Sequence, residues 1–400
     1  MFRTESGKIA AVLCRLFSIR HIEAAEDITS ETFLQALETW PFKGIPENPT
    51  GWLYTVAKNK AKNQFQRNRL FAGKIAKQIR EDAGVAEEIE IDLSEKNISD
   101  SQLQMLFALC HPSIPAEAQI ALSLRLLCGF GAEEIANAFL TNTETINKRM
   151  FRAKEKLRME NVSVELPGES EIPKRLETVL TTLYLLFNEG YYSESQDAVL
   201  REDLCLEAMR LTHLLVDHPL TDAPQVKALL ALMYFHSSRF PVRKNENGEI
   251  VLYQDQDETL WNQEHIARGA WYLKEGSRGN TVSKYHLEAG IAYWHTRKED
   301  TAEKWESILQ LYNHLLLLQY SPVAALNRTY ALSKTRGREA AIREAEKLQL
   351  TSNPYYYSLL GELYRDVDNE KAKEYFERAF TLAKTATDRR TIAKKLEGMA

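Results

Sequence analysis

Apolar residues recur every three or four positions along most of the chain, which is the period of an amphipathic helix and not of a strand. The first such stripe comprises Ile9, Val12, Leu13 and Leu16. A second helix is expected over residues 23–39, and its predicted buried face comprises Ile28, Phe33, Leu37 and Trp40. Because nearly every long segment has this period, we expect an all-α protein.

A loop and a further helix follow. Pro and Gly are concentrated between residues 41 and 51, and these residues interrupt helices. A helix is then expected to begin near Thr50 or Gly51 and to continue through the sixties. Its predicted inward face comprises Leu53, Ala57 and Ala61, extended by Trp52 and Val56.

Residues 124–158 carry the pattern of a helix-turn-helix, in which a short helix and a turn precede a longer basic helix. The short helix is expected to bury Ile135 and Phe139, and residues 141–143 supply the turn and a helix cap. The predicted buried face of the long helix comprises Ile146, Met150, Ala153 and Leu157. Since charged stripes are also common on helices that bind nothing, this segment alone only favours DNA binding.

From about residue 173 the chain is again helical. Near its end the spacing of small and aromatic residues follows that of tetratricopeptide repeats, which are stacked helix pairs. The pattern comprises Tyr357, Leu360, Gly361, Tyr364, Ala372, Phe376 and Ala379, and a weaker copy begins near Ala325 and includes Tyr330. Residues 245–252 suggest a small turn or hairpin.

Composition narrows the candidate functions. The chain has 400 residues, 44% of them hydrophobic, which is enough for two or three packed domains. Its net charge of −5 gives no overall attraction to nucleic acid, so any such contact must come from local basic patches. The four cysteines form no C-x-x-C pair, which argues against a zinc site or a disulfide framework and fits a reducing cytoplasm.

Several classes of protein are disfavoured. No apolar stretch approaches the length of about 20 residues that spans a bilayer, and the N-terminal residues lack a signal-peptide cleavage pattern. The sequence also lacks the phosphate-binding, nucleophile-elbow, zinc-protease and dinucleotide motifs. We therefore expect a soluble cytoplasmic protein.

The local charge changes sign within the first hundred residues. Lys and Arg dominate from residue 58 to residue 80, and Asp and Glu dominate from 81 to 95, as is typical of a solvated linker. We therefore predict five parts. They are a helical domain over residues 1–69, a flexible linker over 70–102, the helix-turn-helix domain over 103–160, a short linker over 161–172 and a helical extension over 173–400.

Two helices present side chains that suit nucleic acid. Lys and Arg neutralise phosphates, whereas Thr and Asn at a helix surface can read base edges. Trp52 near the breaker-rich loop suits a base removed from its stack, although a tryptophan there is more often part of the core. The preceding helix carries Asp27, Glu31 and Glu38, whose charge fits a basic protein surface or a plain polar face, and not DNA.

In their order and spacing these segments resemble the extracytoplasmic-function group of sigma-70-type transcription initiation factors. Residues 25–33 resemble the segment that binds the clamp helices of RNA polymerase. Residues 49–59 resemble the helix that melts and reads the promoter −10 element, and residues 42–51 take the place of the base-capturing loop. The helix-turn-helix resembles the domain that reads the −35 element, and residues 184–191, 254–261 and 321–328 resemble a long C-terminal extension found in one subgroup.

The resemblance implies a sigma factor that is not an enzyme, uses no cofactor or metal, binds bacterial core RNA polymerase and directs it to promoter DNA. The polymerase-binding residues that it implies are Asp27, Glu31 and Phe33. The residues that the resemblance implies for binding the −10 element are Trp52, Thr55, Lys58, Asn59, Lys62 and Asn63. The family commonly has Asp at the position of Asn63. The residues that it implies for binding the −35 element are Thr143, Thr145, Lys148, Arg149, Arg152 and Lys156.

The extension offers less specific candidates. Asn188, Glu189 and Tyr191 suit a regulatory contact, and Asp255 and Asp257 suit either a cation or, more commonly, a helix cap. Since tetratricopeptide-like arrays typically bind peptides, we expect a peptide or protein ligand and a regulatory role. Two other classes stay open: a stand-alone helix-turn-helix regulator with a helical sensor domain, and a tetratricopeptide scaffold whose N-terminal half is merely helical.

Overall fold

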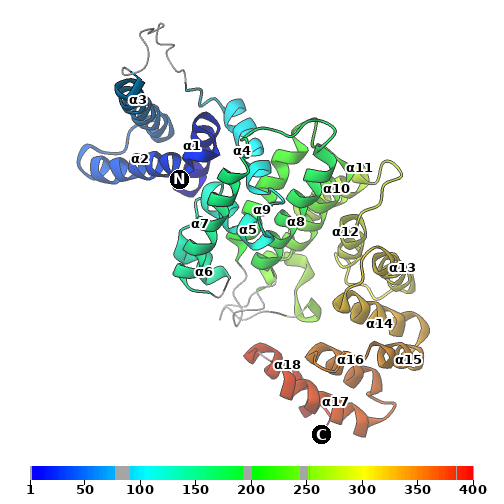
Figure 1. Ribbon diagram of the computed structural model, residues 1–400. Coiled ribbons are helices and arrows are strands. Elements are labelled where there is room, and N and C mark those ends of the chain that lie inside the picture. Colours follow the sequence, from blue (N-terminus) through cyan, green and yellow to red (C-terminus); the bar gives the residue numbers. More distant parts are fainter. Residues whose placement is uncertain are drawn as a thin grey trace. The chain divides into compact units, whose positions relative to one another are not determined.

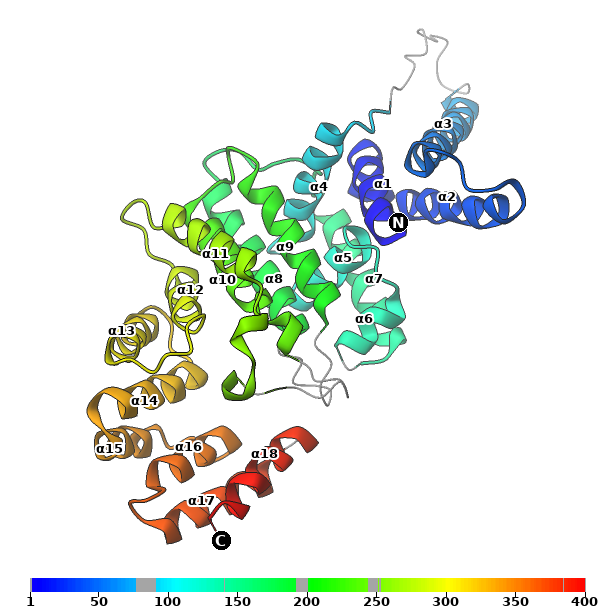
Figure 2. The same cartoon turned by 180° about the vertical axis from the view of Figure 1, so that it is seen from behind.

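The computed structural model describes residues 2–76, 91–139, 141–191, 201–243, 251, 253–383 and 385–399. All regular structure in these residues is helical, which confirms the all-α expectation. The chain divides into two compact units, residues 1–185 and residues 186–400, and each is described by itself. Figures 1 and 2 show the elements from two opposite sides.

The first unit begins with three long helices, which we call the α1–α3 group. They are α1 (Phe2–Phe17), α2 (Ile22–Lys43) and α3 (Pro49–Ala76), with a short 3-10 helix, η1 (Ile19–His21), between the first two. Ile9 and Leu13 of α1 and Leu53 and Ala57 of α3 are buried, as their spacing predicts. The Tyr54 hydroxyl donates to the Glu5 carboxylate at 2.6 Å and so joins α3 to α1.

The loop before α3 is shorter than predicted. Helix α2 was expected to end at Thr39, but it continues through Pro41 to Lys43 and ends where the Gly44 N–H donates to the Trp40 carbonyl at 3.0 Å. A proline in the last turn removes only one bond of the helical ladder, which the packed helix tolerates. Pro49 takes the first position of α3, where a missing N–H costs nothing.

Four more helices make up the α4–α7 group. They are α4 (Glu95–Leu109), α5 (Ala116–Leu126), α6 (Ala132–Ala138) and α7 (Thr143–Met159). Residues 70–76 continue α3 and α4 begins at Glu95, so both ends of the predicted linker are helical. Residues 95–102 were predicted to belong to the linker, but Ile98, Ser101 and Gln102 of this segment are buried in the unit.

The first half of α8 (Ile172–Tyr191) also belongs to the first unit, although the sequence analysis placed it in the extension. Arg175 donates to the Phe107 carbonyl of α4 at 2.7 Å, and the Thr182 hydroxyl donates to the Gln119 side-chain oxygen of α5 at 2.8 Å. Thr182 and Gln119 are both buried. The domain that carries the helix-turn-helix therefore continues beyond the predicted boundary at residue 160.

The second unit is a succession of helices in which neighbours along the chain pack together. Its α-helices are α9 (Glu202–Val216), α10 (Pro224–Ser237), α11 (Gln263–Gly276), α12 (Lys284–Trp294), α13 (Ala302–Leu318), α14 (Pro322–Arg336), α15 (Arg338–Leu348), α16 (Pro354–Tyr364), α17 (Asn369–Leu382) and α18 (Ala386–Glu397). Three 3-10 helices accompany them, η2 (Phe240–Val242), η3 (Tyr253–Asp255) and η4 (Glu258–Leu260). Within the described residues, no helix is both long enough and apolar enough to span a bilayer.

Helices α16 and α17 pack through the residues that the repeat pattern singled out. Tyr357, Leu360, Tyr364, Ala372, Phe376 and Ala379 form one buried cluster. A Cβ on Gly361 would lie 2.7–2.8 Å from the Phe376 ring, so the two helices approach too closely for any larger residue. In the weaker copy Ala325 is buried but Tyr330 is exposed. The suggested hairpin at 245–252 lies, except for Val251, outside the described residues.

This close approach predicts that Gly361→Ala destabilises the second unit. Overpacking costs about 1–3 kcal/mol, which exceeds the gain in helix propensity of up to about 1 kcal/mol. The midpoint of guanidinium unfolding should therefore fall. Gly398→Ala is the matched control, because its φ is −73° and the nearest atoms to the new Cβ lie 3.6 Å away. An equal midpoint for the two variants would contradict the close packing.

Candidate nucleic-acid interface

The helix-turn-helix is formed by α6 and α7, which pack on each other and on α5. Gly129, with a φ of +69°, makes the turn that leads from α5 toward α6. Ile135 of α6 is fully buried, whereas Phe139 is only half-buried. The predicted inner face of α7, Ile146, Met150, Ala153 and Leu157, is buried, which confirms the orientation that the sequence predicted.

The first turn of α7 is fixed by a side-chain cap and presents polar groups. The Asn142 side-chain oxygen accepts the Thr145 N–H at 2.7 Å, which confirms the predicted cap at 141–143. Thr143 and Thr145 are exposed at this end. Exposed hydroxyl groups at the start of such a helix are in the position from which helix-turn-helix proteins read bases.

The predicted basic face of α7 points outward. Lys148 and Lys156 form exposed ion pairs at 2.6 and 2.7 Å with Glu144 and Glu160, one helical turn away. Arg152 is exposed and Arg149 is half-buried. Exposed pairs of this kind contribute at most about 1 kcal/mol, so these lysines can exchange their carboxylate partners for phosphates.

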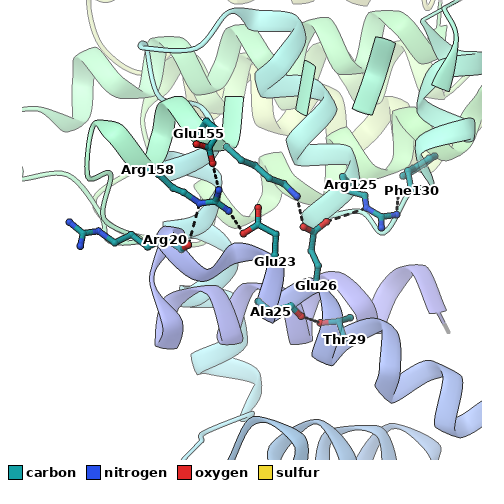
Figure 3. Close-up of polar contacts among 10 residues, drawn as sticks. Arg20, Glu23, Ala25, Glu26, Thr29, Arg125, Phe130, Glu155 and Arg158 are labelled. Carbon is teal, nitrogen blue, oxygen red and sulfur yellow. Dashed lines mark hydrogen bonds and ion pairs between the residues drawn. The ribbon is translucent and has the colours of Figure 1, made fainter. Parts of the chain in front are cut away.

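Two basic residues of α7 are directed elsewhere. Lys154 pairs with Glu26, and Arg158 pairs with Glu23 and Glu155. Glu23 and Glu26 lie on α2, in the other helical group (Figure 3). Sequence reasoning missed this cluster. The sequence does place the acids Glu23 and Glu26 three residues apart. Their basic partners, Arg158 and Lys154, lie more than 120 residues away along the chain, so helical spacing could not pair them.

The outer face of α3 holds most of the predicted −10 residues. Thr55, Asn59, Lys62 and Asn63 are exposed, and Lys58 and Trp52 are half-buried. The Thr55 hydroxyl donates to the Gly51 carbonyl at 2.9 Å within its own helix. The Trp52 ring meets the edge of the Trp40 ring with centroids 5.5 Å apart, and this contact anchors one side of Trp52 in the fold.

The predicted polymerase-binding segment is partly corrected by the structure. Asp27 is exposed, and Glu31 is exposed and pairs with Lys60 of α3 at 3.0 Å. Phe33 is buried, so it stabilises the α1–α3 group and offers no contact surface. Leu37 was expected to be buried, yet 73% of it is exposed, because the helical period drifts away from the core toward the end of α2.

The candidates of the extension lie in the second unit, and two of them have contacts within its fold. The hydroxyl of the buried Tyr191 accepts a hydrogen bond from Arg239 at 2.7 Å, while Asn188 and Glu189 are half-buried. Asp257 caps η4 by accepting the Thr259 N–H at 2.9 Å, and the hydrogen bonds from Thr259 hold the pKa of the Asp257 carboxyl below its usual range. Asp255 is exposed. Among the described residues, no group of His, Cys, Asp and Glu is placed to hold a metal ion.

Comparison with known proteins identifies the family. Residues 1–71 match the family described as Sigma-70 region 2. The extracytoplasmic-function (ECF) RNA polymerase sigma-E factor of Haemophilus influenzae is 30% identical over 154 residues, which cover 37% of this chain and 79% of that protein. The chain belongs to the sigma-70 family. The RNA polymerase sigma-H factor of Pseudomonas aeruginosa agrees, at 30% identity over 156 residues, or 37% of this chain and 77% of that protein.

The remainder of this sigma-70 family protein has a different set of similarities. Residues 175–277 match a family of unknown function (DUF6596). An uncharacterized protein of Rhizobium meliloti is 34% identical over 410 residues, which cover 99% of this chain and 94% of that protein. No solved structure matches the chain. The tetratricopeptide-like character of the extension therefore stays a prediction.

The cap of α7 leads to a test of local order. Asn142→Ala removes the acceptor of the Thr145 N–H and should destabilise the start of α7 by about 1 kcal/mol. Hydrogen exchange of the amides at 143–147 should become several-fold faster. Asn142→Asp retains an acceptor and should leave the exchange near that of the natural protein. Equal exchange in both variants would mean that the cap does not order this turn.

Proposed function

We propose that this chain binds core RNA polymerase and directs it to promoters as a non-enzymatic initiation factor. In this proposal α3 contacts the −10 element and α7 contacts the −35 element. The observation that carries it is that both helices keep their polar and basic side chains on exposed faces while their apolar faces are buried. This is the arrangement that a two-point promoter reader needs.

The surface of α2 supports docking to a protein. Leu34, Leu37 and Phe42 are exposed on α2, and Ile45 is exposed just past its end. The exposed acids Asp27 and Glu31 lie on the same helix. Apolar anchors with a charged rim are typical of protein interfaces, whereas this surface would repel DNA. We therefore assign polymerase binding to Asp27, Glu31 and the two leucines.

The extension is proposed to regulate the promoter-reading half through a peptide or protein ligand. The support is that α8 runs through the boundary between the two units, while Arg175 and Thr182 in its first half donate hydrogen bonds to α4 and α5. Because those residues complete the first unit, truncation after Leu185 tests the role better than truncation after α7 would. Run-off transcription should differ between the truncated and the full chain, and identical output would rule out regulation by residues 186–400.

The polymerase surface can be tested with Leu37→Ser. Loss of a central apolar anchor typically costs more than 1 kcal/mol, so affinity for core polymerase should fall about tenfold. Leu206→Ser removes an exposed leucine from α9 and serves as the control. Fluorescence titration with core polymerase measures both. Unchanged affinity of the Leu37 variant would remove α2 from the interface.

The DNA surface can be tested with Arg149→Ala and Arg152→Ala. Each phosphate contact that is lost should weaken promoter binding by the polymerase complex and reduce the slope of log affinity against log salt by about 0.9. Lys274→Ala, on α11, is a charge-matched control. An unchanged slope in both arginine variants would contradict the assignment. Tight, specific promoter binding without polymerase would instead favour the stand-alone regulator.

A further inference from the structure

The ring of Tyr253 in η3 is the centre of a cluster of cations and aromatic rings in the second unit. The Arg239 guanidinium carbon lies 5.5 Å from the centre of this ring, and the Lys304 ammonium nitrogen lies 5.9 Å from it. The ring centres of His295 and Trp261 lie 5.5 and 6.0 Å from it. We call these five residues the Tyr253 cluster. They come from separate segments between the end of α10 and the start of α13, so only the fold brings them together.

The two cations of the Tyr253 cluster have neutral partners. Arg239 donates to the Tyr191 hydroxyl at 2.7 Å and lies 3.3 Å from Nδ1 of His236. Burial lowers the pKa of His236, so that ring is neutral. The Lys304 ammonium donates to the Arg297 carbonyl. Every described hydrogen bond of these two charged side chains therefore goes to an uncharged group.

Burial makes these charges costly. Lys304 is only 2% exposed, and Arg239 is half-buried. A charge removed from water is unfavourable unless an opposite charge and hydrogen bonds compensate it. The aromatic face of Tyr253 attracts both cations but offsets only part of this cost. An anion in contact with both cations would offset more of it.

The charge around the Tyr253 cluster is positive. The acids nearest to it in the sequence are exposed, namely Asp255, Asp257, Glu258, Glu299 and Asp300. Asp300 already pairs with Lys334 at 3.0 Å. A third cation, Lys298, donates to the carbonyls of residues 254 and 256. Burial and the charges of Lys304 and Arg239 lower the pKa of His295 to about 4, as a positive environment requires.

Trp261 adds a buried donor to the same cluster. It is 3% exposed, and its indole N–H has no acceptor among the described residues. Most buried N–H groups in folded proteins have an acceptor. An oxygen atom of a ligand would supply one here. Because Arg239 and Tyr253 are only half-buried, the cluster keeps some surface in contact with solvent.

We propose that Arg239, Lys304 and the Trp261 N–H bind an oxyanion, the phosphate or carboxylate group of a small ligand, beside the Tyr253 ring. Guanidinium, ammonium and indole groups are donors only, so together they select a negatively charged acceptor. The Tyr253 ring would pack against an apolar or planar part of the ligand. Because the cluster joins the end of α10 to α13, a bound anion should stabilise the second unit.

Titration of the free, full-length chain tests this site. The probes are inorganic phosphate and acetate at millimolar concentrations, with the ionic strength kept constant by sodium chloride. Calorimetry measures their affinity, and thermal unfolding measures the stabilisation. At least one probe should bind and raise the unfolding midpoint. Binding of phosphate alone would assign a phosphate ligand, and binding of acetate alone a carboxylate ligand. Binding of neither probe would overturn the proposal.

Two variants locate the site. Lys304→Met removes the charge and keeps an unbranched apolar chain, and it should weaken probe affinity about tenfold or more. Trp261→Phe keeps an aromatic ring and removes only the N–H, and it should weaken affinity several-fold. Lys371→Met is the matched control, because Lys371 also lies over a tyrosine ring, that of Tyr364 at 5.2 Å, but pairs with Asp368 at 3.5 Å. It should leave the affinity unchanged.

The comparison of variants decides the outcome, because the basic faces of α3 and α7 also attract phosphate. Equal probe affinity in Lys304→Met and Lys371→Met would overturn the proposal. If Lys304→Met does not fold, Arg239→Gln changes a half-buried side chain and takes its place with the same expected loss. Binding is measured without polymerase, so failure of anion binding and failure of the proposed function are independent and distinguishable results.

Discussion

The burial of α1 on two sides is the constraint on which the first unit depends. An amphipathic helix needs one apolar partner surface, and α1 has two, one in the α1–α3 group and one in the α4–α7 group. Gly7 is required because the second partner approaches at backbone distance. The same helix therefore packs in both groups.

The ion pairs between α7 and α2 depend on this packing. Once α7 lies against η1 and α2, Lys154 and Arg158 face the acids Glu26 and Glu23. Burying one member of such a pair without the other would be costly, so these acids and bases constrain each other. The outward side of α7 keeps its own exposed pairs, which are weak enough to exchange for phosphates.

The extension depends on close helix packing. Gly361 against Phe376, and Gly190 against Cys205, are positions where a Cβ would lie within 3.0 Å of a neighbouring helix. Small residues at these points allow successive helices to nest, as in other helical arrays. The repeat-like spacing could be read in the sequence at α16 and α17 because both helices are regular and adjacent along the chain.

Sequence periodicity was enough to determine the helical class, the buried faces of α3 and α7, the Asn142 cap and the exposed character of most of the residues predicted to read DNA. These features depend on neighbours three or four positions away. Tertiary structure alone decided that Leu37 is exposed, that α8 completes the first unit and that Lys154 and Arg158 face α2. Each of these depends on a partner distant in sequence, and helical spacing carries no information about which distant surface will cover a face.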